Sequence, residues 1–314
     1  MKYVSIFALI LFLGSCKNKI DSQGDFHEMT AVKPLLTLAS GNVLRFEKFP
    51  SDFVHARNVD VWLPDNYKKN KKYAVLYMHD GQMLFDSTTT WNKQEWGVDE
   101  TVSKLLKAQK IKNCIIVGIW NISAYRHTDY FPNKPFLSLN KPKQDSILSS
   151  AKSQKLMIEN IQSDNYLKFI VTELKPFIDR NFSTLSDSAN TFVVGSSMGG
   201  LISMYAISEY PNIFGGAACL STHWIGTFTN QNNPIPDAFL RYMEDNLPNA
   251  KTHKLYFDYG TQTLDSLYLP YQNRITQILK IKGYSTNIKF EGHDHSENSW
   301  KERLHIPLEF LLQN

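Results

Sequence analysis

One short motif in the second half of the chain has the residue types and spacing of a catalytic nucleophile. Residues 195–199 read Gly-Ser-Ser-Met-Gly, so Ser197 has a glycine two positions away on each side. A β-branched run at 191–194 precedes the motif, and an apolar run at 200–207 follows it. This is the strand, turn and helix context that presents a serine hydroxyl at a turn too tight for side chains at the two glycines. The pattern predicts Ser197 as a nucleophile and Ser196 as a structural residue packed on the strand side.

A serine hydroxyl becomes a strong nucleophile only when an imidazole takes its proton and a carboxylate holds that imidazole. In this arrangement the acid and then the histidine follow the serine, each on a loop after a late strand. His293 and His295 both lie after the last expected strand, and position alone leaves the choice open. Of the two candidate acids, Asp265 is preferred because it lies past a glycine turn on a loop, whereas Asp258 can still belong to the preceding strand.

Acyl transfer also needs two backbone amides that hold the developing oxyanion. Met198 provides one by its position directly after Ser197. The other is expected from the turn after an early strand, where Gly81 lets the backbone bend and Gln82 donates its amide N–H. His79 and Asp80 are interpreted as structural residues that bond within this turn.

Strands and helices alternate around these residues. Early antiparallel strands are expected at 43–46 and 59–63, and further strands at 73–78, 114–119, 191–194, 254–257 and 287–290. Helices are expected at 98–107, 165–182, 237–245, 267–281 and beyond 296. The alternation predicts an α/β fold with a mostly parallel central sheet and helices on both faces, whose ligands bind beyond the carboxyl ends of the strands. Residues 121–163 show no clear period and are expected to form a rim over the site or a surface insertion.

The N-terminal residues have the features of an export signal. Residues 1–15 combine a charged start with a short apolar run, which is typical of a signal peptide. The following cysteine resembles the end of a bacterial lipobox, which predicts lipidation at Cys16 and a lipid-anchored place in the cell envelope, periplasmic or at the outer membrane. Residues 16–33 are expected to be a tether, and residues 34–314 one domain.

Composition narrows the range of partners. The chain has 314 residues, of which 42% are hydrophobic, enough for one large core. Cys114 and Cys219 lie in apolar runs, so no disulfide framework is indicated. The net charge of +4 is spread along the chain, which does not favour nucleic acid as a partner. The chemistry expected of Ser197 requires no metal and no other cofactor.

Several segments together resemble the putative esterase family of α/β-hydrolases, which includes esterase D-like enzymes, feruloyl esterases, enterochelin esterase-type siderophore hydrolases and mycolyltransferases. The resemblance covers residues 43–312. The matching segments are 77–82 with 84–86, 96–99, 117–119 followed by Arg126, the serine motif with 210–215, and His295-Ser296-Glu297 with Trp300, Arg303 and Leu304.

The resemblance implies roles for individual residues. In the family's histidine box the catalytic histidine stands two positions before the glutamate, which selects His295 over His293. The family's oxyanion donor follows the Asp-Gly turn, in agreement with Gln82. Trp96, Arg126 and Trp224 fall where family members line the acyl or leaving-group pocket, with core or rim packing as the alternative. The implied activity is hydrolysis of carbohydrate-linked acetyl or feruloyl esters, or of siderophore esters, through an acyl-serine. Acyl transfer, or non-catalytic binding in the envelope, is the alternative.

Overall fold

The computed structural model of the chain describes residues 29–157, 160–228 and 232–313. The expected signal peptide, the expected lipidation site Cys16 and most of the expected tether lie outside these residues. Among the helices that are described, none is long and apolar enough to cross a membrane.

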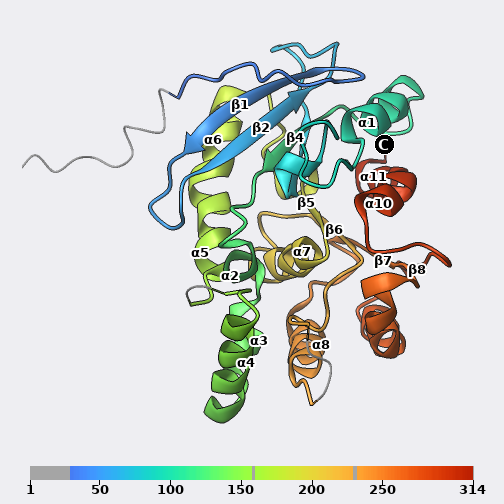
Figure 1. Ribbon diagram of the computed structural model, residues 1–314. Coiled ribbons are helices and arrows are strands. Elements are labelled where there is room, and N and C mark those ends of the chain that lie inside the picture. The colour runs from blue at the N-terminus through green and yellow to red at the C-terminus, as the bar shows by residue number, and fades with distance from the viewer. Residues whose placement is uncertain (1–28, 158–159, 229–231, 314) are drawn as a thin grey trace, which may run out of the picture.

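The described residues form an eight-stranded sheet in the order β1-β2-β4-β3-β5-β6-β7-β8 (Figure 1). The strands are β1 (Asn42–Phe49), β2 (Arg57–Leu63), β3 (Ala74–His79), β4 (Cys114–Ile119), β5 (Thr191–Ser196), β6 (Gly216–Leu220), β7 (Lys254–Tyr259) and β8 (Asn287–Lys289). β2 pairs antiparallel with β1 and with β4, and the other neighbours are parallel. The predicted α/β fold with a mostly parallel sheet is therefore confirmed.

Helices cover both faces of the sheet. One face carries α5 (Ser163–Lys168), α6 (Lys175–Asn181), α7 (Met198–Glu209), α8 (Ile235–Asn246) and α9 (Gln272–Ile281). The other carries α1 (Val98–Lys107), α10 (Glu297–Arg303) and α11 (His305–Leu312), which group together in Figure 1. Successive strand residues point to opposite faces. Val75 and Tyr77 of β3 therefore belong to the first core, and Leu76 and Met78 to the second.

The stretch 121–163, for which no regular period is visible, contains three complete helices in its described residues. They are α2 (Arg126–Tyr130), α3 (Asn133–Leu137) and α4 (Lys141–Ser153). α4 begins where the Asn140 side chain accepts a hydrogen bond from the amide of Lys143. Only Ile147 and Ala151 of α4 are buried, which is too few apolar positions for a sequence pattern to reveal. The described part of this stretch is thus mostly helical, and its first residues, Asn121, Ser123 and Arg126, line the pocket described below.

Two expected helices have different bounds in the structure. The helix expected at 165–182 runs from Ser163 to Asn181 and passes through a π-helical segment, Phe169–Leu174. The helix expected from 267 begins only at Gln272, because a 3₁₀ helix (Thr263–Tyr271) precedes it. Pro270 lies inside this 3₁₀ helix and has no amide to donate to an α-helical bond.

Residues 29–41, here called the N-terminal strap, are anchored to the domain along their length. Val32 exchanges two backbone hydrogen bonds of 2.8 Å with Arg45. The amide of Thr37 donates to Asp86 and that of Ala39 to Asp99, each at 2.7 Å. Packing therefore begins within the segment that the sequence assigns to a tether.

Candidate active site

Ser197 stands at the turn between β5 and α7 in a strained backbone conformation, with φ 56° and ψ −122°. Its amide donates to the Leu220 carbonyl at 2.9 Å, and its carbonyl accepts from the amide of His223 at 3.1 Å. These bonds to the last residue of β6 and to the loop after it hold the turn. The serine is therefore held at the carboxyl end of a central strand, as the motif predicts.

The two glycines of the motif are not equally required. A Cβ on Gly195 would lie 2.6 Å from backbone atoms of Gly199, which no real contact allows. A Cβ on Gly199 would meet its nearest neighbour, the Cβ of His79, at 3.4 Å, an ordinary packing distance. The steric argument for glycine holds firmly at the first position and only weakly at the second.

The structure brings His295 and Asp265 into direct contact. Nδ1 of His295 lies 2.5 Å from Oδ1 of Asp265, which is fully buried in the 3₁₀ helix after β7. Oδ2 of Asp265 accepts from the hydroxyl of Ser221 and the amide of Gly260, each at 2.6 Å. Burial by itself raises the pKa of the Asp265 carboxyl, but the hydrogen bonds from His295, Ser221 and Gly260 outweigh it and hold that pKa below its ordinary value.

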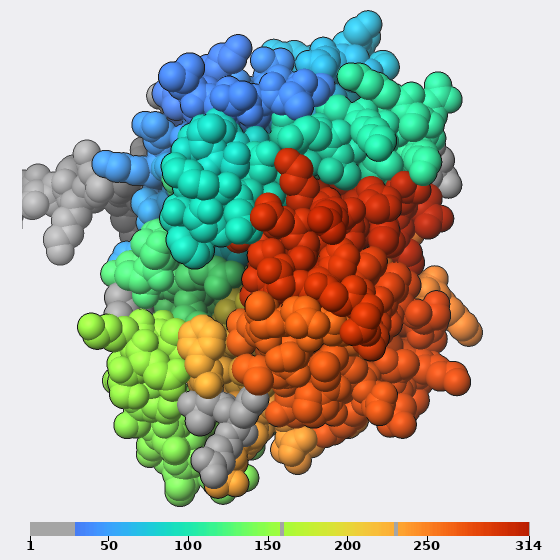
Figure 2. Space-filling view, turned by 45° about the vertical axis from the view of Figure 1, so that its right-hand side comes forward, coloured from blue at the N-terminus to red at the C-terminus, as the bar shows by residue number. Residues whose placement is uncertain are grey.

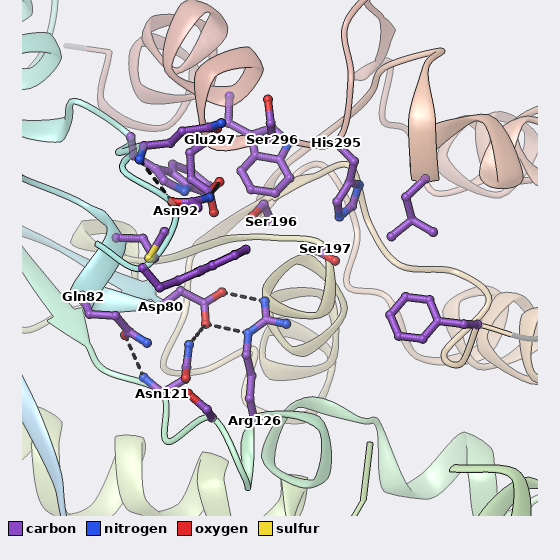
Figure 3. A pocket seen from close by; sticks show the side chains of 18 residues that line it. Asp80, Gln82, Asn92, Asn121, Arg126, Ser196, Ser197, His295, Ser296 and Glu297 are labelled. Carbon is purple, nitrogen blue, oxygen red and sulfur yellow. Dashed lines mark hydrogen bonds and ion pairs between the residues drawn. The ribbon is translucent and has the colours of Figure 1, made fainter. Parts of the chain in front are cut away.

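These contacts determine which nitrogen of His295 carries the proton. Because the ionised Asp265 can only accept, Nδ1 of His295 is a donor, which leaves Nε2 as the acceptor when the ring is neutral. The imidazole packs edge-on against Trp300, with centroids 5.1 Å apart, and against Tyr268 at 5.9 Å. His295 and Ser197 line the same pocket, and Figure 3 shows the imidazole directed toward Ser197. A neutral imidazole in that position has the chemistry of a general base.

The competing acid and histidine have other partners. Asp258 lies within β7 and pairs with Arg303, with contacts of 3.1 and 3.2 Å. Nδ1 of His293 accepts from the same guanidinium at 3.3 Å. The structure therefore brings Asp265 and His295 together, whereas Asp258 and His293 both contact Arg303.

Of the two expected oxyanion donors, one directly follows Ser197 in the chain and the other lines the pocket that Ser197 lines. Met198 is the first residue of α7, and Gln82 lies in the short 3₁₀ helix Gly81–Met83 and lines the pocket. A Cβ on Gly81 would come within 2.5 Å of the Gly118 backbone, so glycine is what lets this turn approach β4. The Gln82 side chain accepts from the amide of Asn121 at 3.1 Å, which fixes the orientation of the turn.

Asp80 bonds to residues outside its own turn, whereas the sequence interpretation placed its partners within the turn. Its carboxylate binds Arg126 through two contacts of 2.7 and 2.8 Å and accepts from the Asn121 side chain at 2.7 Å. Burial raises the pKa of Asp80, but Arg126 and Asn121 outweigh that effect and keep it below its ordinary value. Arg126 lines the pocket, as the resemblance implies, while its charge is balanced by Asp80 (Figure 3).

Two expectations about the pocket wall need correction. Trp224 is 2% exposed and stacks on Phe257 at 6.0 Å in the hydrophobic core, so it packs inside the domain and does not line this pocket. Ser196 does line the pocket, although it was expected to be purely structural. The two-residue period of β5 explains this, because Ser196 continues the row of Phe192 and Val194 past the end of the covering core. Trp96 lines the pocket as expected and packs against Trp300 at 5.5 Å.

The pocket has a volume of about 600 Å³ and includes residues that sequence reasoning did not single out. Trp91 is 84% exposed and Phe228 57% exposed at its lining. The other unexpected members are Met83, Asn92, Gln94, Asn121, Ser123 and Leu264. Most of them lie in irregular segments that no periodic pattern marks. Figure 2 shows the segment around residues 81–97 lying against the C-terminal helices, from which Ser296, Glu297 and Trp300 contribute.

No group of three or more His, Cys, Asp or Glu side chains in the described part of the chain is arranged to hold a metal ion. The fold and the pocket together define a protein of the α/β-hydrolase class, in which a serine at a strand-to-helix turn shares a pocket with a histidine that is bonded to a carboxylate. The family described as "Putative esterase" matches residues 52–306, and the chain belongs to this esterase family.

Individual relatives are distant. "Uncharacterized protein YbbA" from Bacillus subtilis is 24% identical over 170 residues, which cover 54% of this chain and 58% of that protein. The match thus spans little more than half of this relative's length. A solved structure titled ferulic acid esterase is 16% identical with a TM-score of 0.60, covering 87% of this chain and 98% of that one. The enterobactin esterase FES from Shigella flexneri is also 16% identical, with a TM-score of 0.58, covering 82% of this chain and 56% of that one. At such identities the likeness establishes the fold alone.

Proposed function

We propose that this protein is a serine carboxylic ester hydrolase that works through an acyl-serine intermediate. The observation that carries the proposal is a histidine, His295, whose Nδ1 is bonded to the buried Asp265 and which lines the pocket of Ser197. In the proposed first half of the reaction, Nε2 of His295 takes the proton of the Ser197 hydroxyl as Oγ attacks the ester carbonyl. The backbone amides of Met198 and Gln82 hold the resulting oxyanion.

The tetrahedral intermediate then collapses, and the His295 imidazolium gives its proton to the departing alcohol. In the second half, His295 takes a proton from water, and the hydroxide attacks the acyl-serine. The carboxylic acid leaves and Ser197 regains its proton. Throughout, Asp265 stays ionised and stabilises the imidazolium. None of these steps calls for a metal ion or an organic cofactor.

For the substrate, we propose carbohydrate-linked acetyl or feruloyl esters, or siderophore esters. The pocket supports this class by its size, by the exposed rings of Trp91 and Phe228, and by the amide side chains of Asn92 and Gln94, which line it as well. Flat apolar faces combined with hydrogen-bonding groups suit sugar rings and phenolic rings alike. The two similar structures, a ferulic acid esterase and an enterobactin esterase, are named for activities on esters of this range.

The mechanism is tested by activity on p-nitrophenyl acetate or butyrate. Ser197→Ala is expected to lower kcat at least about 10³-fold and to abolish labelling by a fluorophosphonate probe, because both depend on the serine nucleophile. A panel of feruloyl, acetyl-xylan and triscatecholate esters then identifies the substrate. Product analysis with a sugar acceptor present separates hydrolysis from acyl transfer. Undiminished activity of Ser197→Ala would refute the proposal, and failure of the wild type to label would favour a binding protein.

A further inference from the structure

A fully buried hydroxyl connects the candidate acid to the last helices of the domain. Ser221 directly follows β6 and is 0% exposed. Its Oγ lies 2.6 Å from Oδ2 of Asp265, 2.8 Å from Nη2 of Arg303 and 3.0 Å from Nε1 of Trp300. Three segments that are distant in the sequence therefore meet at one oxygen atom.

The chemistry of the partners determines the direction of each bond. The guanidinium of Arg303 and the indole N–H of Trp300 can only donate, so they occupy the two acceptor sites of the Ser221 oxygen. Its single proton is then left for Asp265. Asp265 also receives the amide of Gly260 and Nδ1 of His295, which favours its ionised form.

The backbone of Ser221 is held in a conformation that serine rarely adopts. Its φ is 44°, in the left-handed region. The amide donates to the carbonyl of Asp258 at 2.9 Å, and the Asp258 carboxylate is in turn paired with Arg303. Residues in strained conformations persist where surrounding contacts hold them, and they cluster at functional sites. Here the strain places the hydroxyl between Arg303 and Asp265.

We propose that Ser221 is a positioning residue, whose hydroxyl is oriented by Arg303 and Trp300 and holds Asp265 as the carboxylate that fixes His295. This rests on the proposed function, because Asp265 matters to the rate only if His295 is the base. This role adds a fourth residue to the proposed Ser, His and Asp set. Ser221 is 44 positions from Asp265 and 82 from Arg303 in the sequence.

The first test is Ser221→Ala, assayed on p-nitrophenyl acetate. Loss of a hydrogen bond to a charged group predicts a kcat about 10- to 100-fold lower with KM changed less than about threefold. Ser203→Ala is the matched control, because Ser203 is equally buried and its hydroxyl donates to the helix carbonyl of Gly199. The control is expected to keep kcat within about twofold. Ser221→Gly tolerates the left-handed φ, so it should be at least as stable as Ser221→Ala and equally slow.

A double-mutant cycle with Asp265→Ala separates positioning from general support of the fold. In the Asp265→Ala background, Ser221→Ala is expected to change kcat less than about threefold, because the residue it acts through is gone. The downfield proton resonance of Nδ1–H of His295 should also shift in both Ser221 variants and stay in place in Ser203→Ala.

Three outcomes would overturn the inference alone. These are fully additive losses in the cycle, a wild-type kcat in folded Ser221→Ala or Ser221→Gly, and an unmoved histidine resonance in both variants. An Asp265→Ala variant with wild-type kcat would instead remove Asp265 from the proposed mechanism, and the role of Ser221 with it. The Ser197→Ala experiment judges the esterase proposal independently of all of these.

Discussion

At the scale of single residues, two histidines that stand two positions apart have different partners: His295 is bonded to Asp265, and His293 to Arg303. His295→Ala is expected to lower kcat/KM on p-nitrophenyl acetate at least about 10³-fold, because it removes the proposed base. His293→Ala should lower kcat/KM about tenfold or less, since its ring does not contact the proposed acid. Steady-state kinetics on both variants, with circular dichroism to verify folding, measure the difference. Equal losses would contradict the assignment of the base to His295.

The candidate groups of the site could be predicted more readily than its walls. Ser197 and Asp265 follow from chemistry that restricts such residues to loops at strand ends, whereas the choice of His295 over its neighbour came from the family resemblance alone. The structure places His295 against Asp265 in the pocket of Ser197. Trp224 could not be placed, because a loop tryptophan carries no signal that separates core from pocket. Ser221 could not be recognised because its partners lie far away along the chain.

At the scale of elements, the alternation of patterns located the strands, whereas short or irregular helices were harder to predict. Every residue of β3, β4, β5 and β6 is buried, and such continuous apolar runs are easily recognised. α4 was missed because it buries only two side chains, and the start of α9 was misplaced because a 3₁₀ helix precedes it. The anchoring of the N-terminal strap depends on carboxylates far along the chain, which no local pattern reveals.

One of those anchors should make stability depend on pH. Oδ2 of Asp99, in the first turn of α1, accepts the amides of Ala39 and Ser40 at 2.7 and 3.4 Å. Its Oδ1 and the neighbouring Glu100 Oε2 are buried with no hydrogen-bond partner among the described residues. Burial first, and then the contact with Glu100, raise the pKa of Asp99 to about 7. We therefore expect the two carboxyl groups to share one proton, which would give both of these oxygens a hydrogen-bond partner.

The direction in which stability changes with pH depends on whether the folded or the unfolded state binds that proton. Between the unfolded pKa of about 4 and the folded pKa, the native state holds a proton that the unfolded chain has released, so stability falls as the pH rises. Asp99→Asn cannot titrate, and its amide can donate to Glu100 in place of the shared proton. Urea unfolding from about pH 5 to about pH 8 should therefore show the wild type losing stability relative to Asp99→Asn. A difference that stays constant across this range would argue against the shared proton.

At the scale of the whole molecule, a buried ion pair joins the antiparallel edge of the sheet to the helical layer near the pocket. Nη2 of Arg57 in β2 lies 2.9 Å from Asp129 in α2, and the two side chains are 1% and 4% exposed. The guanidinium also lies over the ring of Tyr166, 5.0 Å from its centroid. A pair 72 positions apart cannot be predicted from composition or period. The pair connects β2 with α2, and no pattern in the sequence indicates that these two elements are in contact.

Breaking this buried pair should lower the free energy of unfolding far more than breaking an ion pair at the surface. Arg57→Met leaves the buried Asp129 without its arginine, and a loss of about 3–5 kcal/mol in the free energy of unfolding is expected. Lys141→Ala is the control, because its partner Asp145 is exposed, and the expected loss is about 0.5 kcal/mol or less. Urea unfolding measures both. Similar losses in the two variants would mean that the buried pair does not join these layers energetically.

The contacts between the segment 81–97 and the C-terminal helices have a consequence for when the protein can work. Asn92 donates to Glu297 and Lys301 to Glu95, each at 2.8 Å, across 205 and 206 positions of the chain. Under the proposed mechanism, a nascent chain still on the ribosome carries its nucleophile long before it carries a base. Ester cleavage would therefore begin only after synthesis has passed the last helices and these have docked.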